Sequence, residues 1–245
     1  MKIRHPIRKI IGTLLITLLY AALALGILVG VKGYRMYEDA ISQMSLEERV
    51  ESIRDGEGFT HYSELTEFYI KAVISVEDHR FMNHFGLDPI AICRAAWRDI
   101  MAGSFKEGGS TITQQLAKNL LFNQDKTMER KVAEIFAVFD IEEQYSKEEI
   151  FELYVNTSNF GSGYYGISEA SEGYFNKLPS ELTDYESALL AGVPNAPSLY
   201  SPDVSLNLAS QRVGQVLQSM VRENALSQGE ADDIQENTEI KGADE

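Results

Sequence analysis

The amino-acid sequence predicts a mostly α-helical protein with one membrane-spanning helix at its N-terminus. Residues 10–31 form an apolar run without a charged side chain. From about residue 59 to residue 224, apolar residues recur with the 3.6-residue period of helices, and alternating runs of β-branched residues are few. Several Ser or Thr residues stand three positions before Glu or Gln, the pattern that begins a capped helix. These three observations favour helix over sheet along the whole chain.

Composition and charge narrow the class of protein. The chain has 245 residues, of which 44% are hydrophobic and 10% aromatic, as in a folded protein with a sizeable core. Its single cysteine, Cys93, excludes an internal disulfide, and we expect it to be a small buried residue. The formal net charge is −15, and outside residues 1–31 there are 18 basic against 37 acidic residues. Nucleic acid is therefore not an expected partner, because phosphate neutralisation needs basic patches.

The N-terminal run, Ile10 to Val31, exceeds the ~20 residues that cross the ~30 Å hydrocarbon core of a bilayer. Four basic residues precede it and no acid accompanies them, so the positive-inside rule predicts a cytoplasmic N-terminus with the remainder of the chain outside. A cleaved signal peptide is the alternative, since Ala22-Leu-Ala24 resembles a cleavage site. That site lies inside the apolar run, which is longer than a usual signal core, so we favour an uncleaved anchor.

Five segments follow from these patterns. They are a cytoplasmic N-terminus (1–9), a transmembrane anchor (10–31), a juxtamembrane helix and linker (32–58), a helical domain (59–226) and an acidic C-terminal tail (227–245). In the tail we expect a short helix that ends in disorder. Within the domain, three capping boxes predict helix starts at Thr111-Ile-Thr-Gln114, Ser146-Lys-Glu-Glu149 and Thr183-Asp-Tyr-Glu186. The prolines of residues 193–202 end the third of these helices.

Glu77 is the first candidate for proton chemistry. It follows the apolar run Tyr69 to Val76, which predicts a buried helix. A carboxylate at the end of such a run is costly unless it is paired or performs proton transfer. A zinc site is disfavoured, because His79 and His84 lack the spacing of four that aligns two ligands on one helical face. Two interpretations stay open: a capped helix end with surface ion pairs, or a functional carboxylate held by Arg80 and His84.

A second motif, Glu107-Gly-Gly-Ser-Thr-Ile-Thr-Gln-Gln-Leu-Ala-Lys-Asn119, runs from two glycines into a helix N-terminus rich in Ser, Thr and Gln. Such an end offers free backbone N–H groups and a positive dipole, which suit an anion. Gln114 and Lys118 are neighbours on one helical face, with Gln115 and Asn119 beside them. The alternative is an ordinary capped helix with a solvated face.

A third motif places Arg130 and Lys131 one turn before Glu134, so the three side chains can meet on one face. They form either a surface ion pair or a pair of cations that grips phosphate beside a carboxylate. The glycines of residues 161–166 resemble a phosphate loop only weakly, and we interpret them as a structural turn. Two carboxylates, several cations and an anchor suit glycosyl transfer from a phosphate-linked donor lodged in a membrane.

Five motifs resemble the peptidoglycan glycosyltransferase family, the polymerase domain of class A penicillin-binding proteins and of monofunctional transglycosylases. They occur in family order over residues 60–202 and read Glu77-Asp-His-Arg-Phe81 with His84 and Gly86, Gly108 to Asn119, Arg130-Lys-x-x-Glu134, Lys147 to Asn156, and Glu186 to Pro194. The resemblance implies a lysozyme-like helical domain with a small membrane-facing subdomain. It aligns residues 90–105 with the membrane-contacting region, for which plain core packing is the alternative interpretation.

The resemblance also implies an activity and residue roles. The family polymerises lipid II into β-1,4-linked glycan strands and releases undecaprenyl pyrophosphate. By position, Glu77 is the general base and Glu134 assists the leaving group, directly or through a divalent metal. Substrate-binding positions carried over in this way, or taken from the motifs above, are Asp78, Arg80, His84, Ser110, Gln114, Gln115, Lys118, Asn119, Arg130 and Lys131.

A divalent metal (Mg²⁺ or Mn²⁺), lipid II with a growing glycan strand, and the bacterial cytoplasmic membrane are the cofactor and partners that the resemblance implies. The metal ligands and any partner proteins of cell-wall synthesis stay unknown. No Ser-x-x-Lys or Lys-Thr-Gly motif occurs, so we expect a monofunctional enzyme, unless the chain is a piece of a bifunctional protein. A lysozyme-like glycan hydrolase and a non-catalytic cell-wall scaffold are the competing functions.

Overall fold

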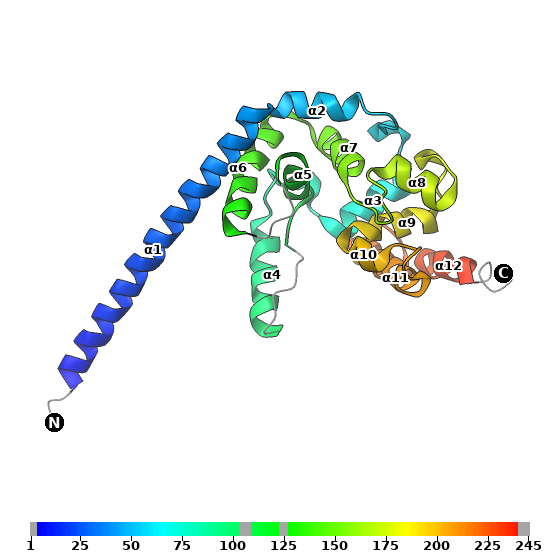
Figure 1. The fold of residues 1–245 in the computed structure, drawn as a ribbon. Helices are drawn as coiled ribbons and strands as arrows, with labels where there is room; N and C mark the ends of the chain where they lie inside the picture. Colours follow the sequence, from blue (N-terminus) through cyan, green and yellow to red (C-terminus); the bar gives the residue numbers. More distant parts are fainter. Residues whose placement is uncertain (1–3, 103–108, 123–126, 240–245) are drawn as a thin grey trace.

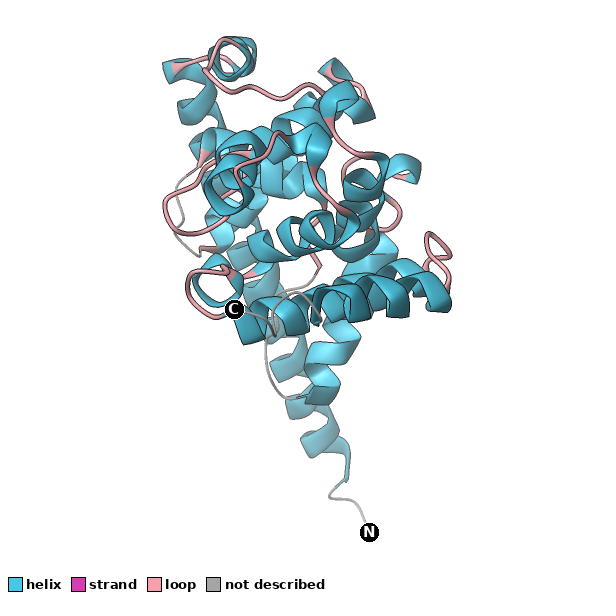
Figure 2. Ribbon diagram, turned by 90° about the vertical axis from the view of Figure 1, so that its right-hand side faces the viewer, coloured by secondary structure: helices cyan, strands magenta, loops and turns pink. Residues whose placement is uncertain are grey.

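The computed structural model describes residues 4–102, 109–122 and 127–239, and it confirms the mostly helical prediction (Figure 1). Figure 2 shows helices joined by loops, and the described residues contain no strand, only an isolated bridge between Asn159 and Tyr165. The α-helices are α1 (Arg4–Gln43), α2 (Leu46–Arg54), α3 (Glu67–Glu77), α4 (Pro89–Ala102), α5 (Ile112–Leu121), α6 (Met128–Gln144), α7 (Lys147–Thr157), α8 (Ile167–Phe175), α9 (Asp184–Gly192), α10 (Pro197–Tyr200), α11 (Leu206–Arg222) and α12 (Gln228–Glu239). Short 3₁₀ turns are η1 (Tyr62–Glu64), η2 (Phe81–Asn83), η3 (Pro179–Glu181) and η4 (Val193–Asn195).

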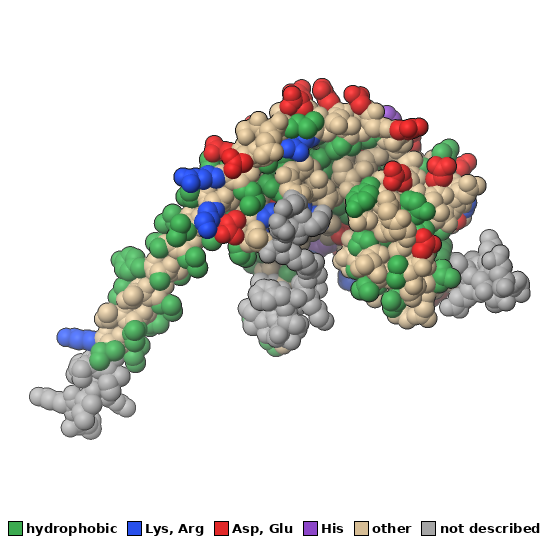
Figure 3. Space-filling model, viewed as in Figure 1, with side chains coloured by type: hydrophobic (Ala, Val, Ile, Leu, Met, Phe, Trp, Pro, Cys, Tyr) green, Lys and Arg blue, Asp and Glu red, His purple; other side chains and the backbone are tan. Residues whose placement is uncertain are grey.

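Helix α1 has the length and composition of a membrane-spanning helix. It contains 40 residues, about 60 Å at 1.5 Å per residue. Its most apolar window has a mean hydropathy of 2.6 and is not buried by the protein. Figure 3 shows hydrophobic side chains along the part of α1 that extends away from the body. This geometry is consistent with a single-pass membrane anchor, and the orientation across the membrane stays a prediction.

The juxtamembrane segment begins as an unbroken continuation of α1 that packs on α6. A Cβ atom added to Gly33 would lie 2.7 Å from the Val132 Cβ atom, so the two helices approach closely at this glycine. One turn later, the Tyr37 ring stacks on Phe136 with 6.1 Å between ring centroids. The buried Tyr37 side chain also donates a hydrogen bond to Asp140. The part of α1 that follows the anchor is therefore packed directly against α6.

Arg49 of α2 secures the corner where α1 ends. Ser45 caps α2 through a capping box with Glu48, and this turns the chain away from α1. The Arg49 guanidinium donates to the Ala40 carbonyl near the end of α1 at 3.0 Å and to the Leu120 carbonyl of α5 at 3.1 Å. Carbonyls in the last turn of a helix lack intrahelical donors, so one arginine stabilises the ends of two helices.

The core is built around α5 and α7. Residues 150–155 of α7 are all buried, so this short helix is enclosed on every side. Helix α5 packs against α6 and α7, while α3 packs against α9 and α11. The three predicted capping boxes are confirmed, at the starts of α5, α7 and α9. Local sequence chemistry therefore fixes where the principal core helices begin.

Helix α4 extends from the body toward the same side as the free end of α1 (Figure 1). Its apolar side chains are exposed: Trp97 is 66% exposed and Met101 71%, and Ile90 and Ile92 are also exposed. Core packing is therefore the wrong interpretation for these residues, and a membrane-facing subdomain fits them. The prediction that Cys93 is buried is also wrong, because it lies on the exposed surface of α4. The Ile100 side chain and Phe105 lie outside the described part of the chain.

The acidic tail begins as a packed helix. Helix α12 buries Ala231 and contacts α11 and α9, so this first part belongs to the folded body. Residues 240–245, for which we expect disorder, lie outside the described residues.

Replacing Gly33 with leucine should separate α1 from α6. The added side chain would overlap Val132, and overpacking of this kind destabilises a protein by about 1–3 kcal/mol. We expect a lower thermal unfolding midpoint in detergent, by about 2–4 °C per kcal/mol. Gly30→Leu is the matched control, because nothing lies within 4 Å of a Cβ atom there. Equal midpoints for the two variants would contradict close packing at Gly33.

Candidate active site

Glu77 is the last residue of α3, and its side chain is only 7% exposed. The Gln115 side chain of α5 donates a hydrogen bond to Glu77 Oε2 at 2.8 Å. On the other oxygen, Oε1, the Arg212 guanidinium of α11 lies 3.8 Å away. Three helices that are distant in the sequence therefore meet at this carboxylate.

The surroundings of Glu77 make it a weaker acid than an ordinary glutamate. Burial raises the pKa of Glu77, and Asp78 raises it further, while the Gln115 hydrogen bond and the cations Arg212 and Lys118 oppose the rise. The net direction is upward. Burial, and to a lesser extent the Glu77 carboxylate, also raises the pKa of Tyr69. A carboxylate with a raised pKa is suited to accept a proton.

Asp78, the neighbour of Glu77, connects the end of α3 to the start of α5 and to His84. Its buried carboxylate accepts the Ile112 backbone N–H at the start of α5 at 3.1 Å. The His84 ring pairs with the same carboxylate at 2.9 Å from Nε2. Arg80 pairs instead with buried Asp88. Burial raises the pKa of Asp88, but the hydrogen bond from Arg80 helps to lower that pKa to about 2. One of the two interpretations of this motif is a functional carboxylate, Glu77, held by Arg80 and His84, but the described contacts of Arg80 and His84 are with these two aspartates.

The third motif forms the predicted cluster on α6. Glu134 is buried, with a side chain 1% exposed, and pairs with both Arg130 and Lys131. The Glu134 Oε2 atom lies 2.8 Å from Lys131 Nζ. Lys131 is 41% exposed and also donates to the Ser110 hydroxyl at 2.8 Å. The prediction that the three charged side chains share one face is confirmed, and the cluster reaches the segment that enters α5.

Helix α5 lies between these two groups of residues. Ser110 just before it contacts Lys131, while Gln115 and Lys118 act on Glu77. Gln114 has a different task, because its side chain accepts the Thr111 N–H in the capping box. Asn119 donates to the Thr157 carbonyl at 3.2 Å. The described hydrogen bonds of Gln114 and Asn119 are thus internal, and Glu107 and Gly108 lie outside the described residues.

The glycines of residues 161–166 confirm the interpretation as a structural turn. Gly161, Gly163 and Gly166 have positive φ values, and Gly166 is the N-cap of α8. A Cβ atom at Gly166 would lie 3.0 Å from the Asn156 carbonyl oxygen, so a side chain there would be strained.

No metal-ligand cluster occurs among the described residues, in the sense of three or more His, Cys, Asp or Glu side chains that converge. Glu134 is one carboxylate already paired with two cations. Among the described residues, therefore, no group of side chains supplies by itself the six oxygen ligands that Mg²⁺ favours.

Arg212 is the site residue that the sequence does not reveal. It lies 135 positions after Glu77, on a helix whose sequence shows only amphipathic spacing. Its Nε atom donates to the Gly192 carbonyl at 3.1 Å, and its guanidinium lies 5.3 Å from the Tyr200 ring centroid. These contacts fix the guanidinium beside Glu77. A single arginine in an amphipathic helix gives no local signal of such a position.

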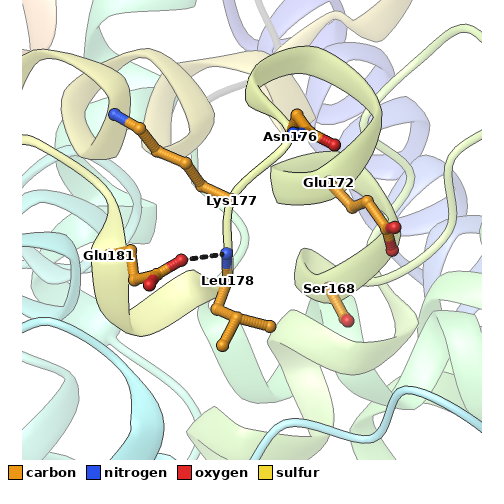
Figure 4. Close-up of a pocket in the computed structure, with 6 residues that line it drawn as sticks. All are labelled: Ser168, Glu172, Asn176, Lys177, Leu178 and Glu181. Atoms are coloured by element: carbon orange, nitrogen blue, oxygen red, sulfur yellow. Dashed lines mark hydrogen bonds between the residues drawn. The ribbon is translucent and has the colours of Figure 1, made fainter.

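A separate shallow pocket of about 180 Å³ lies over α8 and η3 (Figure 4). Its lining includes Ser168, Glu172, Lys177 and Glu181. Glu181 accepts the Leu178 backbone N–H there at 3.0 Å, and Lys177 pairs with Glu186. The pocket contains none of the predicted site residues. The candidate active site is therefore formed by Glu77 with its partners on α5 and α11, and by the charged cluster on α6.

Comparison with known proteins identifies relatives. A family model described as Transglycosylase matches residues 45–221. Penicillin-binding protein 1F of Bacillus subtilis (strain 168) is 46% identical over 161 residues, which cover 66% of this chain and 22% of that protein. Penicillin-binding protein 1A of Vibrio cholerae serotype O1 is 44% identical over 169 residues, covering 69% and 20%. This chain thus spans about a fifth of the length of the curated relatives it matches.

A crystal structure of penicillin-binding protein 1A from Haemophilus influenzae is 28% identical and covers 51% of this chain and 15% of that one. The TM-score is 0.35, which is too low to define a shared fold. The matched family and the helical architecture together fit the lysozyme-like fold class.

Arg212→Ala should raise the pKa of Glu77. A nearby cation favours the charged carboxylate, so removing it favours the protonated form and moves the titration to higher pH. The measurement is a ¹³C NMR titration of the glutamate carboxyl groups, with Glu77→Gln to assign the signal. Lys71→Ala removes a cation from the exposed face of α3 and is the matched control. An unchanged or lower pKa of Glu77 in Arg212→Ala would contradict this account.

Proposed function

Because the chain belongs to the transglycosylase family, we propose that it is a peptidoglycan glycosyltransferase that polymerises lipid II and releases undecaprenyl pyrophosphate. The product is a β-1,4-linked glycan strand. In this reaction the 4-hydroxyl of an acceptor sugar attacks the anomeric carbon of a donor, and the lipid diphosphate leaves with inversion at that carbon.

Glu77 is the proposed general base. Its carboxylate takes the proton from the acceptor hydroxyl as the new glycosidic bond forms. The raised pKa supports this role, because a base works best when its pKa lies near the working pH. Gln115 is hydrogen-bonded to one carboxylate oxygen, and Arg212 lies 3.8 Å from the other.

The cations beside α5 are the proposed diphosphate site. Lys131 is accessible and bonded to Ser110, Arg130 lies beside it, and Lys118 stands on the neighbouring helix. Negative charge grows on the diphosphate as the bond to the sugar breaks, and preorganised cations stabilise that charge. These cations stand out in a protein with 37 acidic and 22 basic residues.

Glu134 assists the leaving group through its neighbours in this proposal. Its side chain is buried and pairs with Arg130 and Lys131, so it holds both cations in place. A divalent metal, Mg²⁺ or Mn²⁺, is part of the proposal only as a companion of the substrate. The diphosphate oxygens and water would supply most of its ligands, since the protein offers no ligand cluster of its own in the described residues.

The proposal locates the reaction at the bacterial cytoplasmic membrane. Helix α1 anchors the chain, the N-terminus lies inside and the catalytic domain lies outside. Lipid II and the growing strand are the partners in this reaction. The exposed apolar side chains of α4 are suited to the membrane surface from which a lipid-linked substrate enters.

One observation carries the proposal: a buried carboxylate with a raised pKa is bonded to α5, and a cationic cluster is bonded to Ser110, which lies just before the same helix. A hydrolase needs carboxylates but has no use for the diphosphate cations, and a scaffold has no use for either. The test uses purified full-length protein, labelled lipid II and a divalent metal. Glycan strands identify a polymerase, shortening of preformed glycan identifies a hydrolase, and no turnover under varied metal and detergent favours a scaffold.

Glu77→Gln should lower the polymerisation rate at least ~10²-fold, the lower range for loss of a general base. Glutamine keeps the shape of the side chain but cannot accept the proton. The measurement is the initial rate of strand formation from labelled lipid II. Glu67→Gln, on the exposed start of the same helix, should retain the normal rate. Near-normal turnover by Glu77→Gln would remove this residue from the base role.

Lys131→Ala should weaken donor binding as well as turnover. A hydrogen bond to a charged group contributes about 1.5–3 kcal/mol, so we expect the apparent affinity for lipid II to fall about tenfold to a hundredfold. Arg130 still pairs with Glu134 in this variant, so the fold of α6 should persist. Titration of catalytically inactive Glu77→Gln protein, with and without Lys131→Ala, measures binding alone. Unchanged affinity would contradict the diphosphate site.

A further inference from the structure

An open, shallow groove of about 550 Å³ lies along α11 beside the candidate active site. Val76, the residue before Glu77, lies at its wall, and Arg212 is shared between the groove and the Glu77 carboxylate. The remaining polar lining comes from one face of α11 and from α12. It consists of Gln211, Gln215, Gln218, Ser219, Arg222 and Gln235.

The charge of this groove differs from that of the rest of the protein. Its lining holds two arginines and four glutamines but no acidic residue, in a chain with 37 acids. Arg212 donates to the Gln215 side-chain oxygen at 3.0 Å, which fixes both groups. Arg222 pairs with Glu223, which does not line the groove, at 3.1 Å. Within the described contacts, Gln218 makes no hydrogen bond, so its amide is available to a ligand.

This lining selects a class of ligand. Glutamine side chains both donate to and accept from peptide groups, and arginine pairs with carboxylates. Gln211, Gln215, Gln218 and Arg222 form a row, and the helix rises about 16 Å from the first to the last. Roughly five residues of an extended peptide span the same length. The groove therefore fits a short extended peptide that carries a carboxylate.

We propose that this groove binds the peptide attached to the sugar of the acceptor lipid II, its stem, and so directs the acceptor hydroxyl to Glu77. The inference rests on the proposed function, because it names the part of the substrate that the same site holds. Arg212 joins the groove to the base, because it lines the groove and its guanidinium lies 3.8 Å from Glu77 Oε1. A stem seated on α11 places the attached sugar at the end of α3, where the proton is removed.

The kinetic test compares full-length wild type with Gln211→Ala/Gln218→Ala on two substrates. One is lipid II with its complete stem, and the other is the same lipid-linked disaccharide without a peptide. With the complete stem we expect the double variant to raise KM about tenfold while kcat stays within about twofold. Without the peptide, the two proteins should have equal KM. Gln43→Ala/Gln228→Ala changes two exposed glutamines outside the groove and is the matched control.

A binding measurement separates this proposal from the proposed function. Lipid-free disaccharide-peptide is titrated into wild type and double variant while side-chain amide signals are followed by NMR. Shifts of the groove glutamines in wild type, and weaker binding by the variant, support the groove even if no polymer forms. Equal binding by both proteins, or an equal kinetic loss on both substrates, would overturn it while leaving the polymerase role intact.

Discussion

The buried carboxylate of Asp78 is the interaction on which the geometry of the site depends. It joins the end of α3 to the start of α5, because it accepts the Ile112 N–H and is fixed from the other side by His84. The N-terminus of a helix favours an anion, so α5 stabilises the carboxylate that holds it. Glu77 is the adjacent residue, and its distance to Gln115 follows from this junction. The same start of α5 brings Ser110 to Lys131, so one buried contact aligns the residues around both glutamates.

Helix α6 connects the charged cluster to the anchor. One face presents Arg130, Lys131 and Glu134, and another receives Gly33 and Tyr37 of α1. Arg49 adds a second connection, since it bonds to carbonyls of both α1 and α5. The cations therefore keep a fixed relation to α1. In the proposed reaction, this rigidity holds them at the height above the membrane at which the diphosphate of the substrate lies.

The sequence predicts the features whose chemistry is local. A capping box involves residues only three positions apart, so the sequence predicts the starts of α5, α7 and α9. The i, i+4 spacing likewise predicts that Arg130 pairs with Glu134. Contacts between residues that are far apart in the sequence could not be predicted in this way. Arg212 gives no signal at all, because its partner Glu77 lies 135 positions away in the sequence. The apolar spacing of α4 is the same for a core and for a membrane surface, so only the exposure of Trp97 separates the two.

The two glutamates differ because their partners differ. Glu77 is buried at the end of a helix, and this burial raises its pKa. The hydrogen bond from Gln115 and the positive charges of Arg212 and Lys118 offset only part of that rise. Glu134 is more deeply buried, with a side chain 1% exposed against 7% for Glu77, and it pairs directly with two cations, so its charge holds them in position. In the proposed reaction, the group that accepts a proton needs the first environment, and the group that organises positive charge around the leaving diphosphate needs the second. In that reaction the same residue type serves at both ends of one displacement, and α5 sets the arrangement of the two.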